Sequence, residues 1–223
     1  MCDAQCNIKK INLPDEFIKA CQNDNVDVIN NLIKNNNMAR DMILIEGSYS
    51  FRLACCCKSS NVAQYIQETF NMNRDEMMCN HNEVFNNACI YGNINIAKWL
   101  YNVCHLTKDE IVGSFNDIFR FVCKNGHIDV AKWLVKICNM EKKDIFDYEY
   151  NGFVMAYQNG HYNIAKWIYE LYKPSREEIM TYNNIAFRFA CEGNHFDIAL
   201  WLKIICKMSK EEMGIYRSLC IFY

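Results

Sequence analysis

Residues 85–104, FNNACIYGNINIAKWLYNVC, contain the pattern that decides the fold. Phe85, Ala88 and Cys89 have the i, i+3, i+4 spacing of apolar residues on one face of an α-helix. Gly92 interrupts this pattern, and a glycine just past the last turn of a helix favours a left-handed cap. Beyond the glycine the apolar residues again follow helical spacing. The stretch therefore predicts two short helices joined by a glycine turn.

The same pattern recurs at intervals of 34 residues. The tryptophans are spaced by this interval, and a phenylalanine stands fourteen residues before each tryptophan position. The equivalent residues are Trp99, Trp133, Trp167 and Trp201, with Phe17, Phe51, Phe85, Phe119, Phe153 and Phe187. A fixed period of about 20–50 residues is typical of stacked repeats. We therefore expect six tandem helix-turn-helix repeats whose repeated side chains form a shared core.

A polar stretch near the end of the repeat carries a second motif. A helix-capping residue is followed three positions later by glutamate in segments 73–76, 107–110, 175–178 and 209–212. In such a capping box, the first side chain accepts a hydrogen bond from a backbone amide of the helix, and the glutamate bonds back to the first amide. This motif predicts a short third helical turn. The glycines at 92, 126, 160 and 193 are expected to end the first helices.

The segments GHIDVA (126–131) and ACIYGNINIA (88–97) resemble the A-A-x-x-G-H-x-x-I-V core of ankyrin repeats. The longer pattern F-x-x-A-C-x-x-G-[HN]-I-x-I-A-K-W-L is similar to the divergent ankyrin repeats abundant in giant viruses of amoebae, such as Mimivirus. The resemblance covers residues 14–212 and implies an all-α, ankyrin-like solenoid. Its six repeats would be about 14–47, 48–81, 82–115, 116–149, 150–183 and 184–212.

Two departures from related repeat families leave alternatives. The tetratricopeptide repeat shares the 34-residue period, but its helices are longer and its tryptophan lies in the first helix, so the ankyrin-like interpretation is preferred. The stretch that forms a β-hairpin finger in ankyrin repeats lacks the G-A-D-x-N signature here, and Glu83, Val84 and Asn86 replace Thr, Pro and His of the T-P-L-H entry. This stretch is either a hairpin or, as the capping boxes favour, a helical turn.

The two ends of the array differ from its middle. Residues 1–13 form an N-terminal tail in this scheme, and Asn30 and Asn31 give the first repeat the polar outer face that a terminal repeat needs. The last segment, 213–223, is a C-terminal cap or a truncated seventh repeat. It either covers the sixth repeat or docks on a partner or a second copy. A homodimer would then form through Leu219, Ile221, Phe222 and Tyr223.

Eight of the fourteen cysteines occupy two positions of the repeat. They are Cys21, Cys55, Cys89, Cys123 and Cys191 at one position, and Cys104, Cys138 and Cys206 at the other. Tyr157 replaces cysteine once at the first position, so we interpret both as packing positions, where free cysteine behaves as a small buried hydrophobe.

A zinc site is the alternative for the remaining sulfur and imidazole groups. Cys56, Cys57, Cys79 and His81 could converge between the second and third repeats, but they lack the C-x2-4-C spacing of zinc motifs. His127, His161 and His195 share one repeat position, where neighbours lie about 10 Å apart, one helix layer, and cannot share an ion. We expect these histidines to form hydrogen bonds at the turns. No metal or other cofactor is predicted.

Composition excludes several classes of function. The chain has 24 Lys and Arg against 26 Asp and Glu, a net charge of −2, which argues against nucleic-acid binding. It has no signal peptide and no run approaching the about 18 apolar residues of a membrane helix. A cytoplasmic protein is expected, in the host cytoplasm if it is viral. None of the common catalytic or nucleotide-binding motifs occurs, and we expect no enzymatic activity.

The most consistent function is therefore protein binding, as in a scaffold that engages another protein, a host protein if the chain is viral. Repeat proteins bind partners through an extended concave face whose residues vary while the core repeats. By resemblance to ankyrin proteins, this face would comprise Ile90, Tyr91, Lys124, Asn125, Gln158 and Asn159, with Asn82, Asn116, Tyr150 and Asn184. The alternative is a structural element that self-assembles through its apolar C-terminal end.

Overall fold

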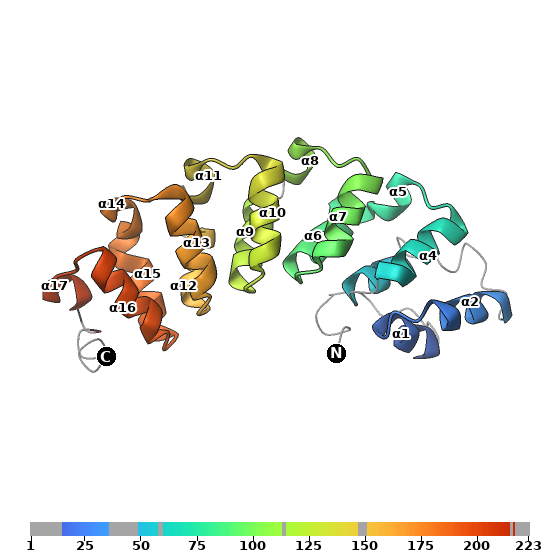
Figure 1. The fold of residues 1–223 in the computed structure, drawn as a ribbon, viewed down its shortest axis with the longest axis horizontal. Coiled ribbons are helices and arrows are strands. Elements are labelled where there is room, and N and C mark those ends of the chain that lie inside the picture. Colours follow the sequence, from blue (N-terminus) through green and yellow to red (C-terminus); the bar gives the residue numbers. More distant parts are fainter. Residues whose placement is uncertain are drawn as a thin grey trace. The chain divides into compact units, whose positions relative to one another are not determined.

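The computed structural model describes residues 15–35, 49–57, 60–112, 115–146, 151–214 and 216. These residues form helices joined by short turns and contain no β-strand, which confirms the all-α class (Figure 1). The chain divides into two compact units, residues 1–107 and 108–223, called here the N-terminal and C-terminal units. Each is described by itself.

The N-terminal unit is a succession of short helices. Residues 49–56 are helical, and the other helices are α1 (Asp15–Gln22), α2 (Val26–Asn35), α4 (Ser60–Phe70), α5 (Arg74–Met77), α6 (Cys79–Ile90) and α7 (Ile94–Val103). The two helices on either side of a turn pack against each other, as in the pairs α1–α2 and α6–α7. This is the arrangement that the sequence pattern around Gly92 predicts.

The C-terminal unit repeats the arrangement. Its first helices, α9, α12 and α15, pack in that order, and each contacts the second helix that follows it: α10, α13 and α16. The bounds are α8 (Lys108–Val112), α9 (Phe115–Lys124), α10 (Ile128–Cys138), α11 (Lys142–Phe146), α12 (Gly152–Gln158), α13 (Tyr162–Tyr172), α14 (Arg176–Ile179), α15 (Thr181–Glu192), α16 (Phe196–Ile205) and α17 (Lys210–Met213).

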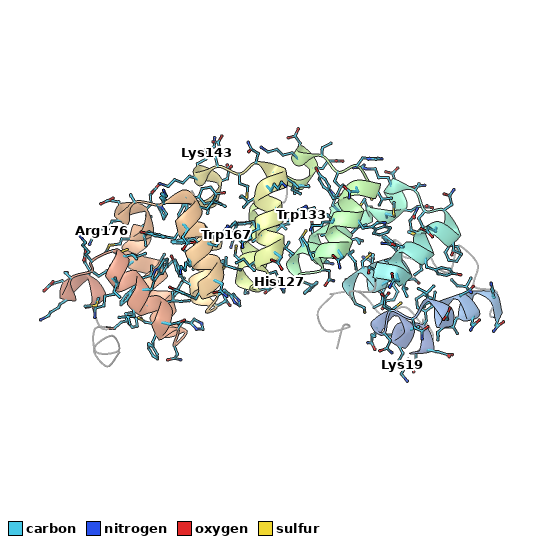
Figure 2. All side chains as sticks on the ribbon, in the orientation of Figure 1. Lys19, His127, Trp133, Lys143, Trp167 and Arg176 are labelled. Carbon is cyan, nitrogen blue, oxygen red and sulfur yellow. The ribbon has the colours of Figure 1, made fainter. Side chains whose placement is uncertain are left out.

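The side chains that recur every 34 residues form the core. All six phenylalanines of the first helices are at most 2% exposed. The tryptophans are half-buried, and Trp201 contacts the preceding repeat through Tyr157, Tyr162 and Tyr169 at ring-centroid distances of 6.1, 5.6 and 5.3 Å. Trp99 likewise contacts Phe51 at 6.0 Å. Figure 2 shows the corresponding Trp133 on α10 and Trp167 on α13.

The turn between the two helices of a repeat needs a residue in the left-handed conformation. Gly92, Gly126 and Gly160 have φ of 76°, 82° and 75°, as predicted. The prediction for Gly193 is wrong, because its φ is −79° and Asn194, with φ of 61°, takes the left-handed position. Asn194 stands 34 residues after Gly160, and asparagine tolerates this conformation better than most residues do.

The polar stretch after each second helix is a short helix. Complete capping boxes join Asn73 with Glu76, Ser175 with Glu178, and Ser209 with Glu212, and α8 begins directly after Thr107. The helical turn is therefore correct for these stretches, and no hairpin finger occurs in them. The sequence motif missed α11, where the Glu141 amide donates to the Asp144 carboxylate at 2.8 Å.

Candidate partner-binding face

In the N-terminal unit, the candidate residues Ile90 and Tyr91 end helix α6. Both are half-buried, and Tyr91 is the C-cap residue, whose backbone amide donates to the carbonyl of Asn87 at 2.9 Å. Burial raises the pKa of the Tyr91 phenol above its ordinary value. The backbone therefore holds this aromatic residue in place while part of its ring remains accessible.

In the C-terminal unit, the candidate residues lie at the ends of α9 and α12. Lys124, Asn125 and Gln158 are exposed. Asn159 is half-buried, and its side-chain amide donates to the carbonyl of Met155 at 2.9 Å. Three of these four side chains are thus available to a partner, whereas Asn159 caps its own helix.

Phe121 was not predicted from the sequence and is the most exposed aromatic residue of the described C-terminal unit. It is 42% exposed on α9, and the Lys124 ammonium lies 5.7 Å from the centre of its ring. An ammonium at this distance from an aromatic face is attracted to it. The equivalent residues are Asn87, Met155 and Phe189, so only the repeat alignment carries a signal: a position that varies between polar and large apolar residues.

The four residues expected before the first helices have a different location. Asn82 and Asn184 lie inside α6 and α15, in left-handed conformations with φ of 62° and 57°. The expectation was wrong about their position because these helices begin earlier, at Cys79 and Thr181. The side chain of Asn184 donates to the carbonyl of Glu212 at 3.0 Å. Tyr150 and the side chain of Asn116 lie outside the described residues.

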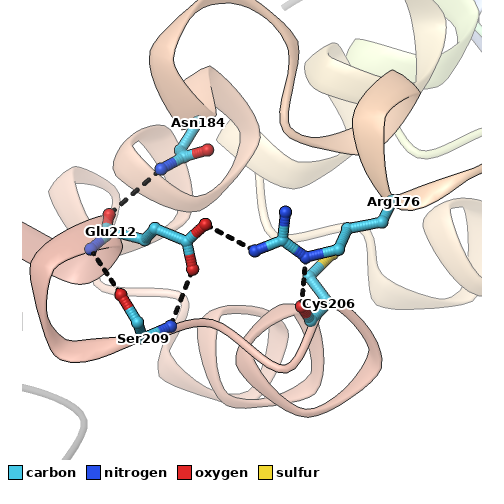
Figure 3. A network of polar contacts seen from close by, with 5 residues as sticks. All are labelled: Arg176, Asn184, Cys206, Ser209 and Glu212. Carbon is cyan, nitrogen blue, oxygen red and sulfur yellow. Dashed lines mark hydrogen bonds and ion pairs between the residues drawn. The ribbon is translucent and has the colours of Figure 1, made fainter.

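A polar network around Arg176 links successive repeats of the C-terminal unit (Figure 3). The Arg176 guanidinium donates to the carbonyl of Cys206 at 2.8 Å and pairs with the carboxylate of Glu212. The same carboxylate accepts a hydrogen bond from the Ser209 amide at 2.7 Å. The bond from Arg176 is the main cause that lowers the pKa of Glu212. Arg74 makes the equivalent bond to the Cys104 carbonyl, at 2.8 Å.

The buried cysteines are packing residues, as predicted. Cys21, Cys55, Cys89, Cys104, Cys123, Cys138, Cys191 and Cys206 are free thiols and are all buried. Burial is the main cause that raises the pKa of Cys138 and of Cys206 to about 11, and it also raises the pKa of Cys55 and Cys123. Because the thiolate is the reactive form, these sulfurs are poor nucleophiles.

The described residues contain no group of three or more metal-binding side chains that could hold an ion. The side chains of Cys79 and His81 lie outside the described residues, as does the C-terminal stretch with Leu219, Ile221, Phe222 and Tyr223. Cys56 is disulfide-bonded, and a sulfur in that state does not ligate zinc as a thiolate. None of the described helices has the length and apolar character needed to cross a membrane.

Comparison of the sequence with models of known protein families and with curated proteins found no match. The residues at the ends of the first helices are therefore the basis for a functional proposal.

Proposed function

We propose that the chain is a non-enzymatic binding scaffold, an ankyrin-like repeat solenoid that engages a protein partner through the ends of its first helices. The observation that carries the proposal is the exposed pair Phe121 and Lys124, held on a helix whose other side is core. The ring supplies apolar contact area, and the ammonium supplies charge. Exposed aromatic residues concentrate the free energy of protein interfaces.

The contrast between repeated and variable positions supports the same proposal. Phenylalanine recurs in every first helix, whereas the residues at positions 90, 124 and 158 are Ile, Lys and Gln. A side chain that only fills the core has to keep its size and polarity from repeat to repeat. Variation on an ordered face instead suits recognition of one specific partner.

The test has two stages. Proximity labelling with the full chain identifies partners, and titration calorimetry then measures the Kd of the purified partner for the wild type and for Tyr91→Ala, Phe121→Ala and Lys124→Glu. Phe121→Ala is expected to raise the Kd about 30-fold, the effect of losing an interface residue worth about 2 kcal/mol. Circular dichroism checks that the fold is retained.

Lys132→Glu is the matched control for Lys124→Glu, because Lys132 is equally an exposed lysine but lies on the second helix α10. It should leave the Kd within about twofold, the small effect of an exposed charge outside the interface. An unchanged Kd in all three first-helix variants would contradict the assignment of this face.

A further inference from the structure

The solvent-facing side of α16 is apolar, unlike that of the other second helices in the C-terminal unit. Two positions of each second helix, four residues apart, face away from the repeat. They are Lys132 and Lys136 on α10, Lys166 and Glu170 on α13, and Leu200 and Ile204 on α16. The four charged residues are exposed, whereas Ile204 is 64% exposed and is the most exposed large apolar residue of the described chain.

The geometry of α16 explains why these two side chains are left uncovered. Ile198, Ala199 and Leu202 are buried in the core, and Trp201 packs against tyrosines of α12 and α13. At about 100° per residue, Leu200 and Ile204 project away from both contacts. A helix that is apolar on all sides is normally covered on all sides.

Charged residues continue this face at both ends of the helix. Asp197 and Lys207 are exposed, and the face has the order Asp197, Leu200, Ile204, Lys207. The order is symmetric about position 202: an apolar residue stands two positions to each side, and residues of opposite charge stand five positions to each side. An antiparallel copy of the same helix therefore places Leu200 against Ile204 and Asp197 against Lys207, as a two-fold interface requires.

We propose that two copies of this chain associate through antiparallel contact of their α16 helices. Leu200 and Ile204 form the centre of the contact, and two Asp197–Lys207 pairs close its ends, about 15 Å apart along each helix. A contact between single helices falls below the about 1,200 Å² that stable interfaces bury. The dimer is therefore weak and reversible. It leaves Phe121 and Lys124 unoccupied, because they lie on α9.

Sedimentation equilibrium of the full chain, from about 1 to 500 µM, tests the proposal over the range expected for a small interface. The variant L200K/I204E gives α16 the charged residues of α13 and should weaken association at least tenfold. Leu171→Glu is the matched control, because Leu171 is 49% exposed but lies on α13 outside this face. It should dimerise like the wild type. Circular dichroism should give equal helix content for all three.

Charge reversal separates the interface from the stability of the helix. Asp197→Lys and Lys207→Asp should each weaken the dimer several-fold, and the double variant should restore it, because it re-forms both pairs with reversed polarity. If these charges act only on the helix dipole, the double variant should instead be the worst of the three. That result would overturn the proposed charge pairs.

Two other results would overturn the proposal as a whole. One is a wild type that stays monomeric at every concentration. The other is a dimer that L200K/I204E leaves intact but that removal of residues 219–223 abolishes, which would place the interface at the C-terminal end. Neither result bears on the binding face of the first helices, because that face is tested by the Kd of a different molecule.

Discussion

The turns of the N-terminal and C-terminal units use different side chains at the same repeat position. In the C-terminal unit, His161 Nε2 lies 2.8 Å from the carbonyl oxygen of Lys124 and therefore carries the proton that it donates. In the N-terminal unit, the amide of Asn93, only 5% exposed, donates to the carbonyl of Cys55 at 2.9 Å. Both bonds satisfy a carbonyl near the end of the preceding first helix, a group without a partner inside the helix.

The difference teaches where glycine is needed. The His161 ring packs directly on Gly126, where an added Cβ would lie 2.6 Å from the ring, and His195 packs on Gly160 at 2.5 Å. In the first repeat, Asp24 takes the left-handed position with φ of 51° and accepts a hydrogen bond from the Val62 amide at 3.0 Å. The turn therefore requires a left-handed residue everywhere, and glycine only where a ring covers it.

The largest expected effect follows from placing a side chain under the ring. Gly126→Ala should destabilise the chain by about 2–3 kcal/mol, from the left-handed conformation and the displaced His161 ring. Urea unfolding followed by tryptophan fluorescence measures the loss. In the double variant with His161→Ala, the two effects should be non-additive by about 1 kcal/mol or more, since the clash is already removed. Strict additivity would refute the packing of the ring on this glycine.

Asn93→Ala should have the next largest effect. It leaves the buried carbonyl of Cys55 without its hydrogen bond, at a cost of about 1–3 kcal/mol. Thermal unfolding by circular dichroism is a sufficient measurement. Asn95→Ala is the control, because Asn95 is exposed on the same helix and should change stability by less than about 0.5 kcal/mol. Equal losses in the two variants would mean that the Asn93 bond contributes nothing specific.

His161→Ala should cost less than Asn93→Ala, about 0.5–1.5 kcal/mol. His161 is half-buried, so water can replace the imidazole at the Lys124 carbonyl. Urea unfolding of both variants in one buffer compares the two turns directly. If His161→Ala costs more, then packing of the ring on Gly126, and not the burial of the bond, dominates the stability of the turn.

The smallest expected change is a gain at the cysteine position of the fourth first helix that the structure describes in full, α12. Tyr157 is fully buried there, and its hydroxyl has no hydrogen-bond partner. Tyr157→Phe removes this unsatisfied group and should stabilise the chain by up to about 1 kcal/mol. Tyr157→Cys, the residue of the equivalent positions, should instead destabilise it by leaving a cavity. Differential scanning calorimetry should give Tm shifts of opposite sign.

Much of the fold could be predicted because periodic apolar residues specify helices locally. The phenylalanine and cysteine positions, the glycine turns at 92, 126 and 160, and the capping boxes follow from spacing alone. The misplaced cap at Gly193 shows the limit: two residues at the turn, Gly193 and Asn194, can both end a helix, and only their backbone angles distinguish them. The candidate face was harder to predict, because exposure depends on what the neighbouring repeats cover.

The sequence by itself determined where helices begin and end and which side chains are apolar, because these properties depend on residues within one or two turns. The tertiary structure alone decided that Phe121 and Ile204 remain exposed, that Tyr157 is buried with an unpaired hydroxyl, and that Asn184 is used inside the fold. Those outcomes depend on contacts between residues about one repeat apart. No local pattern records which neighbour covers a given side chain.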